Sequence, residues 1–405
     1  MYQHEYRLTL DQTYRKISSM KILKAFKFRL KTNSTTSVLL ASIAGSNRFV
    51  WNKALAYQKE RLENKEYTLS YYKMAPLLLE WKKEHTFLGD CPSQSLQQTL
   101  MAQDRAIKDA FNKKSPKNFP QFKKKGQHDS FRYPQGIRVS DNRVFLPKIG
   151  WVGFFKSRDI PGKIKNATVS KKGEHWFVSI QTELEAEKPV HGATSAIGVD
   201  LGVKKFATLS DGRVYETKNS FKKRQARLAK LQQRLSKKKK GSSNFKKLKK
   251  RINKLHTKIA NIRQDYLHQV STDISKNHAL VVLEDLKVAN MSKSASGTLD
   301  EPGKMVAAKS GLNRSILDQG WHSFKSMLSY KLDHLGGELL LVDPRYTSQK
   351  CSSCGHTEKD NRLSQSQFAC MGCGFRENAD INAAQNVLAA GHAVLSLQPE
   401  VALAA

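Results

Sequence analysis

The spacing of hydrophobic positions divides this chain of 405 residues into segments with different predicted structures. Apolar and basic residues alternate over 21–31, which predicts a half-exposed strand. Between 35 and 114 the apolar positions recur every three or four residues, which indicates several helices. Residues 130–185 return to short alternating segments separated by turns. This order predicts a small β-barrel that is interrupted by a helical domain.

The part of the chain after Ala196 has a different pattern, in which the predicted strands are nearly continuous apolar runs. AIGVDLGVKKFATLSDGRVYE is typical of a strand, a tight turn and a second strand, and HALVVLEDL and ELLLVDP predict two more buried strands. Residues 315–337 predict one helix ended by glycines, and the Gly- and Ser-rich residues 289–313 predict a mobile loop. A domain boundary is expected at EKPVHGATS, before the first of these strands.

A strongly basic stretch lies inside this second part, because residues 217–264 contain nineteen Lys or Arg and no acid. A plain run of charge is more often disordered. Here, however, the apolar residues step by three and four: Phe245, Leu248, Ile252, Leu255, Ile259 and Ile262, preceded by Leu228, Leu231 and Leu235. This spacing predicts a helical hairpin with a coiled-coil-like seam and a basic outer face.

The charge balance predicts the kind of partner. The chain has 70 basic and 35 acidic residues and therefore a formal net charge of +35. Such an excess is typical of proteins that bind nucleic acid. No run approaches the roughly 18 apolar residues of a membrane-spanning helix, so a membrane is not an expected partner.

Four of the five cysteines form the pattern C-x₂-C-x₁₅-C-x₂-C: Cys351, Cys354, Cys370 and Cys373. Four thiolates in two tight turns can close a tetrahedron around Zn²⁺, which predicts a structural zinc ribbon without a catalytic role. A redox dithiol and an iron–sulfur cluster are the alternatives. Since Cys91 stands alone, this usage fits a reducing compartment and predicts a cytoplasmic protein.

Three acidic residues are candidates for chemistry. Asp200 follows the apolar SAIGV, Glu284 follows ALVVL, and Asp380 lies beside the last predicted helix, just past the ribbon. An acid in such a place can simply terminate a strand, but a buried carboxylate is costly unless it binds a cation. Phosphodiester hydrolysis commonly uses two divalent metals held by acids from separate elements, so the three acids together predict such a site.

Other acids compete with these three. Asp285 is a rival of Glu284, because neighbours on a strand point to opposite faces and periodicity cannot choose between them. Asp343, at the end of ELLLVD, is a second-rank candidate for the same pocket. Asp211 precedes a glycine and is expected to serve a turn.

Several motifs together resemble the TnpB family, RNA-guided DNA endonucleases of bacterial insertion sequences that are related to the type V CRISPR effectors. They are GVDLGVKKFAT around Asp200, VLEDLKVANM around Glu284, DPRYTSQKCSSCG at the ribbon and ADINAAQN around Asp380. KAFKFRL, NRFVWN and FPQFKKKG also match family landmarks, so the resemblance covers nearly all of residues 20–390.

The resemblance implies a multidomain α+β fold. A wedge β-barrel, interrupted by a helical recognition domain, is followed by an RNase H-like (RuvC) α/β nuclease domain with an inserted four-cysteine zinc ribbon. The expected boundaries are an N-terminal extension at 1–19, the barrel at 20–34 and 119–188, the helical recognition domain at 35–118, the nuclease domain at 189–344 and 375–395, the zinc-ribbon target-nucleic-acid-binding module at 345–374 and a tail at 396–405.

The resemblance also implies the chemistry. The catalytic triad falls on Asp200, Glu284 and Asp380, which settles Glu284 over Asp285, and these acids would hold two Mg²⁺ ions, with Mn²⁺ as a substitute. The family binds a guide RNA made from the end of its own element and cuts both strands of guide-complementary double-stranded DNA beside a short motif. The protein is expected to be a monomer in that complex.

Contacts to nucleic acid are expected at exposed polar and basic positions. For each of them, the alternative is a solvated surface residue. They are Gln97 in the helical domain, Lys123, Lys124 and Lys125 in the linker, Lys204 and Arg376 near the acids, and Lys238 and Lys239 in the basic hairpin.

Three other functions fit the sequence less well. A guide-directed repressor that has lost cleavage is recognised by a broken triad, whereas all three acids are present here. A transposase of the associated His-hydrophobe-His type needs two His at i and i+2, and none of the twelve His is so spaced. A zinc-ribbon RNA-binding protein without enzymatic activity would leave the strand-end acids unexplained.

Overall fold

The computed structural model describes residues 19–187, 189–298 and 300–396, which form two compact units divided after Glu187. Each unit has a hydrophobic core of its own. Within the described ranges, no helix has the length and apolar composition needed to cross a membrane. Of the predicted extension only Ser19 is described, and of the predicted tail only Ser396; the remaining residues of both lie outside the described ranges.

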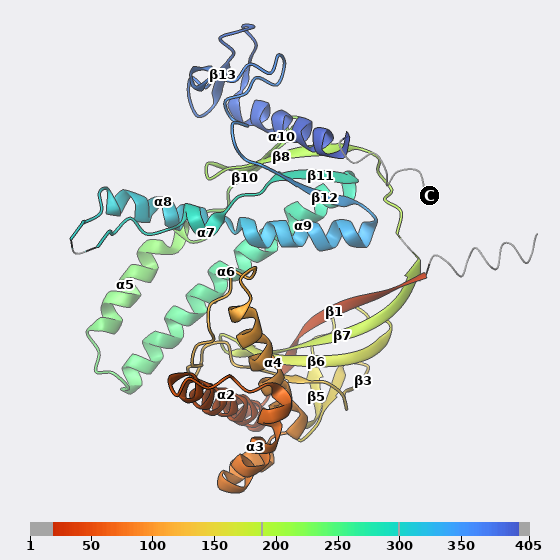
Figure 1. Ribbon diagram of the computed structural model, residues 1–405, viewed down its shortest axis with the longest axis vertical. Helices are drawn as coiled ribbons and strands as arrows, with labels where there is room; N and C mark the ends of the chain where they lie inside the picture. The colour runs from red at the N-terminus through yellow and green to blue at the C-terminus, as the bar shows by residue number, and fades with distance from the viewer. Residues whose placement is uncertain (1–18, 188, 299, 397–405) are drawn as a thin grey trace, which may run out of the picture. The chain divides into compact units, whose positions relative to one another are not determined.

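The first unit is built on a seven-stranded antiparallel sheet of order β2-β6-β7-β1-β5-β4-β3 (Figure 1). Strand β1 joins its two halves, because it pairs with β7 as far as Arg29 and with β5 from Leu30 onward. The strands are β1 (Ser19–Lys31), β2 (Ser130–Tyr133), β3 (Arg138–Ser140), β4 (Arg143–Leu146), β5 (Gly150–Phe154), β6 (Lys163–Lys172) and β7 (His175–Glu187).

Helices are inserted between β1 and β2, as the spacing predicts: α2 (Ser34–Glu63), α3 (Tyr71–Glu84), the short 3₁₀ helix η1 (Thr86–Asp90) and α4 (Ser93–Phe111). The side chain of Asn33 caps the first of them by accepting a hydrogen bond of 2.8 Å from the backbone N–H of Thr36. Leu40 and Leu96 of the helices belong to the same buried cluster as Phe28 of the sheet. The helical insert therefore shares a hydrophobic core with the strands.

The second unit is built on a five-stranded sheet of order β10-β9-β8-β11-β12. The three parallel strands are β8 (Ala196–Leu201), β11 (Leu280–Glu284) and β12 (Glu338–Val342), and the two antiparallel ones are β9 (Lys205–Leu209) and β10 (Val214–Glu216). Different helices cover its two faces. Side chains of α6 (Ser243–Asn277) and α9 (Trp321–Leu335) pack on one face, and α10 (Ala379–Ser396) packs on the other.

Gly198 of β8 decides how closely α10 approaches the sheet. A Cβ atom on Gly198 would lie 2.1 Å from the carbonyl oxygen of Ala384 and 2.7 Å from the backbone nitrogen of Leu388, so a larger residue fits only if the helix moves. Asp200 is two residues after Gly198, and Asp380 lies in the first turn of α10. The close approach of helix and strand therefore brings these two acids toward each other.

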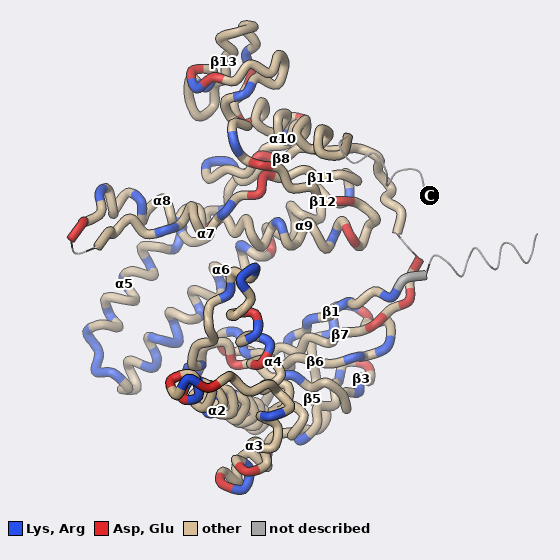
Figure 2. The backbone as a smooth tube through the Cα atoms, in the orientation of Figure 1, with Lys and Arg blue, Asp and Glu red and all other residues tan. Residues whose placement is uncertain are grey.

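The predicted basic hairpin is present in the second unit. After the 3₁₀ turn η2 (Lys222–Arg224), the helices α5 (Gln225–Ser236) and α6 form its two arms. The buried seam consists of Leu228, Ile252, Leu255 and Ile259, with Leu231 and Leu235 partly buried. Figure 2 shows Lys and Arg along both arms. The apolar seam thus orders a stretch whose charges alone would keep it unfolded.

The helix that was predicted over 315–337 is in fact two helices. Helix α8 (Val306–Gln319) ends at Gly320, which has a left-handed φ of 74°, and α9 begins at the next residue. A left-handed residue cannot continue a right-handed helix, and glycine adopts this conformation without strain. The apolar spacing continues across the break, which is why periodicity alone missed it.

The loop that was predicted over 289–313 is also partly helical. Helix α7 (Val288–Met291) ends inside this range and α8 begins inside it. Two contacts between the helices explain the order: Lys309 donates to the backbone carbonyl of Met291 at 2.7 Å, and Asn313 donates to that of Ser292 at 3.0 Å. Tertiary contacts therefore override the low helix propensity of Gly and Ser.

The cysteine module is a small ribbon between β12 and α10. It contains the 3₁₀ turn η3 (Lys359–Asn361) and the antiparallel pair β13 (Gln367–Ala369) and β14 (Arg376–Asn378). Among the described residues, its core is Phe368 packed with Cys351, Cys370 and Ala379, with the partly buried Phe375 against them. So small a core needs another source of stability.

Candidate active site

Asp200 and Glu284 lie side by side at the carboxyl edge of the five-stranded sheet. Val199 of β8 pairs with Leu283 of β11 in parallel register, and each acid is the next residue of its strand. Gly198 faces α10, and side chains two residues apart on a strand point the same way, so Asp200 also faces α10. The parallel pairing thus joins two acids that are far apart in the chain.

Asp380 completes the group from the first turn of α10. Two cations lie beside its carboxylate: Nη2 of Arg362 is 3.6 Å from Oδ1, and Nζ of Lys205 is 3.9 Å from Oδ2. Its backbone N–H donates to Oδ1 of Asn378 at 3.0 Å, which secures the start of the helix.

The three carboxylates share one electrostatic environment. Burial raises the pKa of Asp200 to about 7, and the negative charges of Glu284 and Asp380 act in the same direction, against Arg362 and the backbone N–H of Leu201. Burial also raises the pKa of Glu284, although a hydrogen bond from Thr347 opposes this. Asp200 and Glu284, whose pKa values are raised, are suited to a divalent cation, whose charge would restore their ionised forms.

The raised pKa of Asp200 should make the stability of the metal-free protein depend on pH. Between its usual value of 3.8 and about 7, the folded protein keeps a proton on Asp200 that the unfolded chain releases, so the free energy of unfolding falls as pH rises. We expect urea unfolding in EDTA to show this fall, with an upper limit of about 4 kcal/mol. Asp200→Asn should flatten the slope; an unchanged slope would assign it to other groups.

Thr347 connects the ribbon to the acids. Its side chain is buried, and its hydroxyl donates a hydrogen bond of 2.6 Å to Oε1 of Glu284. Asn386 of α10 donates to the backbone carbonyls of Thr347 and Lys350 at 2.9 and 2.6 Å, and Asn382 donates to that of Lys350 at 2.8 Å. One network therefore holds the root of the ribbon, the last helix and Glu284 together, which gives both asparagines of ADINAAQN a structural role.

The structure separates the rival acids from this group. Hydrogen bonds from Lys287 and Lys325 lower the pKa of Asp285 to about 2, and Lys325 belongs to α9, on the opposite face of the sheet from α10. The carboxylate of Asp343 is 54% exposed and pairs with Arg345 at 2.6 Å. Neither side chain is placed to join the cluster.

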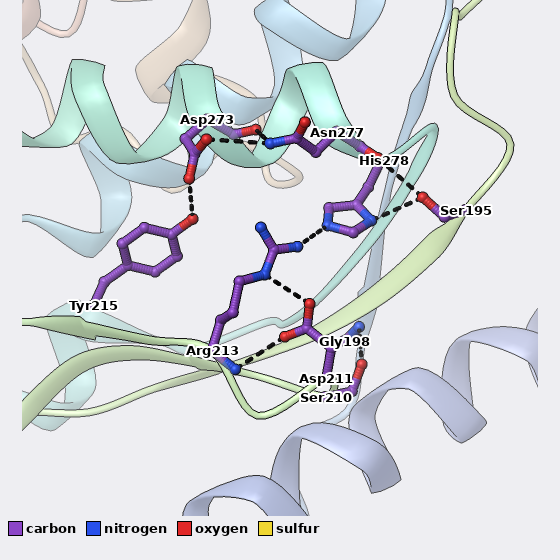
Figure 3. Close-up of polar contacts among 9 residues, drawn as sticks. All are labelled: Ser195, Gly198, Ser210, Asp211, Arg213, Tyr215, Asp273, Asn277 and His278. Atoms are coloured by element: carbon purple, nitrogen blue, oxygen red, sulfur yellow. Dashed lines mark hydrogen bonds and ion pairs between the residues drawn. The ribbon is translucent and has the colours of Figure 1, made fainter.

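Asp211 serves the turn between β9 and β10, as its sequence context predicts. Figure 3 shows its carboxylate accepting a hydrogen bond of 2.7 Å from Arg213, whose guanidinium donates to Nε2 of His278 at 2.7 Å. Since Nε2 accepts, Nδ1 of His278 carries the proton and faces Oγ of Ser195 at 2.9 Å. Burial and the charge of Arg213 lower the pKa of His278, which agrees with a neutral ring. This network joins the turn to the strands and has no contact with the acid cluster.

The four ribbon cysteines meet, as their spacing predicts. Their sulfur atoms all lie within 4.8 Å of one another, with Cys351 and Cys373 3.8 Å apart and Cys354 and Cys370 3.6 Å apart. A tetrahedron with Zn–S bonds of about 2.3 Å has edges of about 3.8 Å, so the four residues could hold a metal ion such as zinc. In the described ranges no other group of His, Cys, Asp or Glu is so compact, and the three carboxylates are spaced more widely.

Parts of the chain match three known protein families. Residues 179–295 match a family described as probable transposase, residues 321–387 match the Cas12f1-like TNB domain, and residues 20–66 match a helix-turn-helix domain. In the structure this last range holds β1 and the single long helix α2.

Two similar proteins extend over nearly the whole chain. The chain is 54% identical over 381 residues to InsQ of Escherichia coli (strain K12), which is assigned as an RNA-guided DNA endonuclease, and the match covers 93% of this chain and 94% of InsQ. It is 32% identical over 385 residues to a protein of Streptomyces pristinaespiralis with the same assignment, over 92% of this chain and 90% of the other. The chain belongs to the TnpB family.

The fold of this TnpB chain is similar to that of Cas12f1 in its cryo-EM complex with single guide RNA and target DNA. The TM-score is 0.51, the sequence identity is 14%, and the match covers 91% of the TnpB chain and 98% of the other chain. Because the sequence identity is low, this comparison supports a shared fold and no conclusion about activity.

Two cations that were not predicted from the sequence lie beside the acids of this TnpB chain. Lys204 and Arg376 are exposed, and the nearby residues Lys205 and Arg362 are the ones that reach Asp380. Lys204 and Arg376 stay predictions of nucleic-acid contacts, and Lys205 is the second lysine of the KK pair in GVKKFAT. Arg362 lies in the irregular part of the ribbon, where no periodicity could single it out.

The remaining predicted contacts lie on exposed parts of the TnpB chain. Gln97 is exposed on α4, and the ammonium group of Lys123 lies 3.7 Å from the ring centroid of Trp51, a cation–π contact. Lys124 and Lys125 follow it in the exposed linker, and Lys238 and Lys239 are exposed at the end of the basic hairpin. All stay predictions of nucleic-acid contacts.

Proposed function

We propose that this chain is an RNA-guided DNA endonuclease of a bacterial insertion sequence, which cuts guide-complementary double-stranded DNA beside a short motif. The observation that carries the proposal is the cluster of Asp200, Glu284 and Asp380 at one sheet edge, with Arg362 and Lys205 beside it. The net charge of +35 and the assigned activity of the two similar proteins support it.

The proposal includes a RuvC-type nuclease domain of the RNase H fold. It is supported by the sheet of the second unit, in which β9 and β10 are antiparallel to their neighbours while β11 and β12 run parallel to β8. The seven-stranded sheet and α2–α4 would be the wedge barrel and the recognition domain, and the ribbon would be the target-nucleic-acid-binding module. The domain boundaries given above belong to this proposal.

Asp200, Glu284 and Asp380 would hold two Mg²⁺ ions, which Mn²⁺ could replace. Carboxylate oxygens are the ligands that these hard cations prefer, and three acids of which two have raised pKa values fit that role. When bound, such ions supply activation of a water nucleophile and stabilisation of the leaving oxygen. The ribbon cysteines would hold one structural Zn²⁺.

The protein's own residues then position the nucleic acid. Arg362 and Lys205 approach Asp380 only to 3.6 and 3.9 Å, so both can turn to a phosphate that enters the cluster. Thr347 orients Glu284 through its hydroxyl. The basic hairpin would follow the nucleic-acid backbone and contribute affinity without sequence preference. We expect one chain in each complex.

Plasmid interference in cells tests this function. The chain and the RNA from its own locus, reprogrammed to a plasmid target flanked by randomised bases, are compared with an Asp200→Asn version. Depletion of plasmids that carry one flanking motif, by the unmodified chain alone, would establish guided cleavage. Motif-dependent silencing of a reporter by both versions, without depletion, would instead establish the alternative function, a guide-directed repressor of the same fold.

Thr347→Val is expected to slow cleavage by about 10- to 100-fold while leaving the fold intact, because partners that orient metal ligands contribute about that much. Valine keeps the shape of threonine but cannot donate to Oε1 of Glu284. The cleavage rate against Mg²⁺ concentration should show a higher half-saturating concentration, with the melting temperature within a few degrees of the unmodified protein. Thr347→Ser is the control that should restore both. An unchanged Mg²⁺ dependence in Thr347→Val would show that the hydroxyl has no positioning role.

A further inference from the structure

A cavity of about 440 Å³ opens at the carboxyl ends of β8 and β11, next to the acid cluster. Leu201 and Leu283 line it from the two strands, and Trp321 lines it from α9. Glu284 forms part of its wall, and residues 286–290 form another part. The cavity therefore shares a carboxylate with the proposed reaction site, and most of its lining is apolar.

The indole of Trp321 gives this cavity a flat apolar wall. The residue is 4% exposed, and its Nε1 atom is fully buried, so the apolar part of the ring forms the lining. A flat apolar wall is suited to a flat heteroaromatic ring.

The rim of the cavity is positively charged. Lys287 and Lys325 both line it and share the single negative charge of Asp285, and His322 lies beside them. The rim thus complements an anionic group attached to the ring that the apolar walls would hold. A nucleoside with its phosphate has both parts.

The position of the cavity indicates which DNA strand it would bind. The cavity lies at the carboxyl ends of β8 and β11, where Leu201, Leu283 and Trp321 belong to the face of the sheet that α9 covers. Of the three acids, Glu284 is the one that lines it, so the cavity meets the acid cluster there. A phosphate held at the acids would leave the neighbouring nucleoside over these ends. In a guided complex the displaced DNA strand is unpaired, and its bases are free to enter.

We propose that this cavity binds one unpaired nucleoside of the DNA strand being cut, beside the phosphate held at the acids. This inference rests on the proposed function. Every base has a flat ring that can pack on apolar side chains, so the pocket would hold the strand in place without selecting a base. Selection would be left to the guide.

The test removes one base at a time. Target duplexes with a single abasic nucleotide at successive positions of the strand to be cut are cleaved by the chain with guide RNA and Mg²⁺ under single-turnover conditions. We expect one position next to the cut at which loss of the base slows cleavage about tenfold, the usual size of one base contact. Equal rates at all positions would overturn the inference.

A variant that fills the cavity provides a second, independent test of the inference. Ala289 is an exposed residue of the lining, so Ala289→Trp can occupy the space with the fold intact, and melting curves check this. We expect it to cut intact DNA about tenfold more slowly, with no further loss at the sensitive abasic position. Ala308→Trp, on the exposed part of α8 and outside the lining, is the matched control and should behave like the unmodified chain.

Ala289→Trp cutting intact DNA as fast as Ala308→Trp would overturn the pocket while the proposed function stands. Failure of the unmodified chain to cut any intact guided target would reject the proposed function and this inference with it.

Discussion

Asp200→Asn is expected to lower the rate of guided DNA cleavage by at least about 10³-fold, because two-metal sites supply several kcal/mol of transition-state stabilisation. The amide keeps the size of the side chain and removes the charge at the centre of the cluster, where Glu284 and Asp380 both act on it. Affinity for guide RNA and uncut target should stay within a few-fold, since positive surfaces elsewhere carry the binding. Single-turnover cleavage and gel-shift titration measure the two quantities.

Asp343→Asn is the matched control for this experiment. Asp343 directly follows β12, the strand beside β11, but its carboxylate pairs with Arg345 and is half-exposed. It should cut DNA at the rate of the unmodified chain. Equal losses in both variants would mean that charge anywhere along the sheet edge matters and that the cluster is not a defined metal site.

Cys351→Ser is expected to abolish binding of the zinc ion that the four cysteines are proposed to hold, unfold the ribbon and lower cleavage by at least about 100-fold. Small metal modules take their folding energy from the ion, and orienting partners contribute about 10- to 100-fold. The ribbon has only Phe368 and its neighbours as a core, so three thiolates would not keep it folded. Its root also orients Glu284 through Thr347. Unfolding of the ribbon should therefore also disturb the position of Glu284 in the acid cluster.

Metal analysis, limited proteolysis and cleavage rates together test this prediction. Zinc should fall from one ion per chain to none, and new cleavage sites should appear within residues 345–374, while the five-stranded sheet, whose core contains no ribbon residue, stays resistant. Cys91→Ala, a buried cysteine of the first unit, is the control that should keep the zinc. A zinc-free Cys351→Ser protein with the full cleavage rate would show that the ribbon does not support the site.

The sequence alone was enough for the features that depend on local spacing. Alternation along 21–31 and the three-and-four spacing from Leu228 to Ile262 predicted β1 and the basic hairpin, because burial of one face of a strand or helix repeats with a fixed period. The cysteine spacing predicted a cluster because each pair lies within a single tight turn. The motifs around the acids were enough to suggest the family.

Only the tertiary structure decided which side chains meet. Strand periodicity could not choose between Glu284 and Asp285, and the family motif pointed to Glu284 without a physical reason. The reason is that α10 covers one face of the sheet and α9, with Lys325, covers the other. The same holds for Lys205 and Arg362 beside Asp380, and for the cavity at Trp321. These arrangements depend on packing between segments that are distant in the sequence, such as the contact of Gly198 with α10. Such packing cannot be predicted from the periodic spacing of residues within one segment.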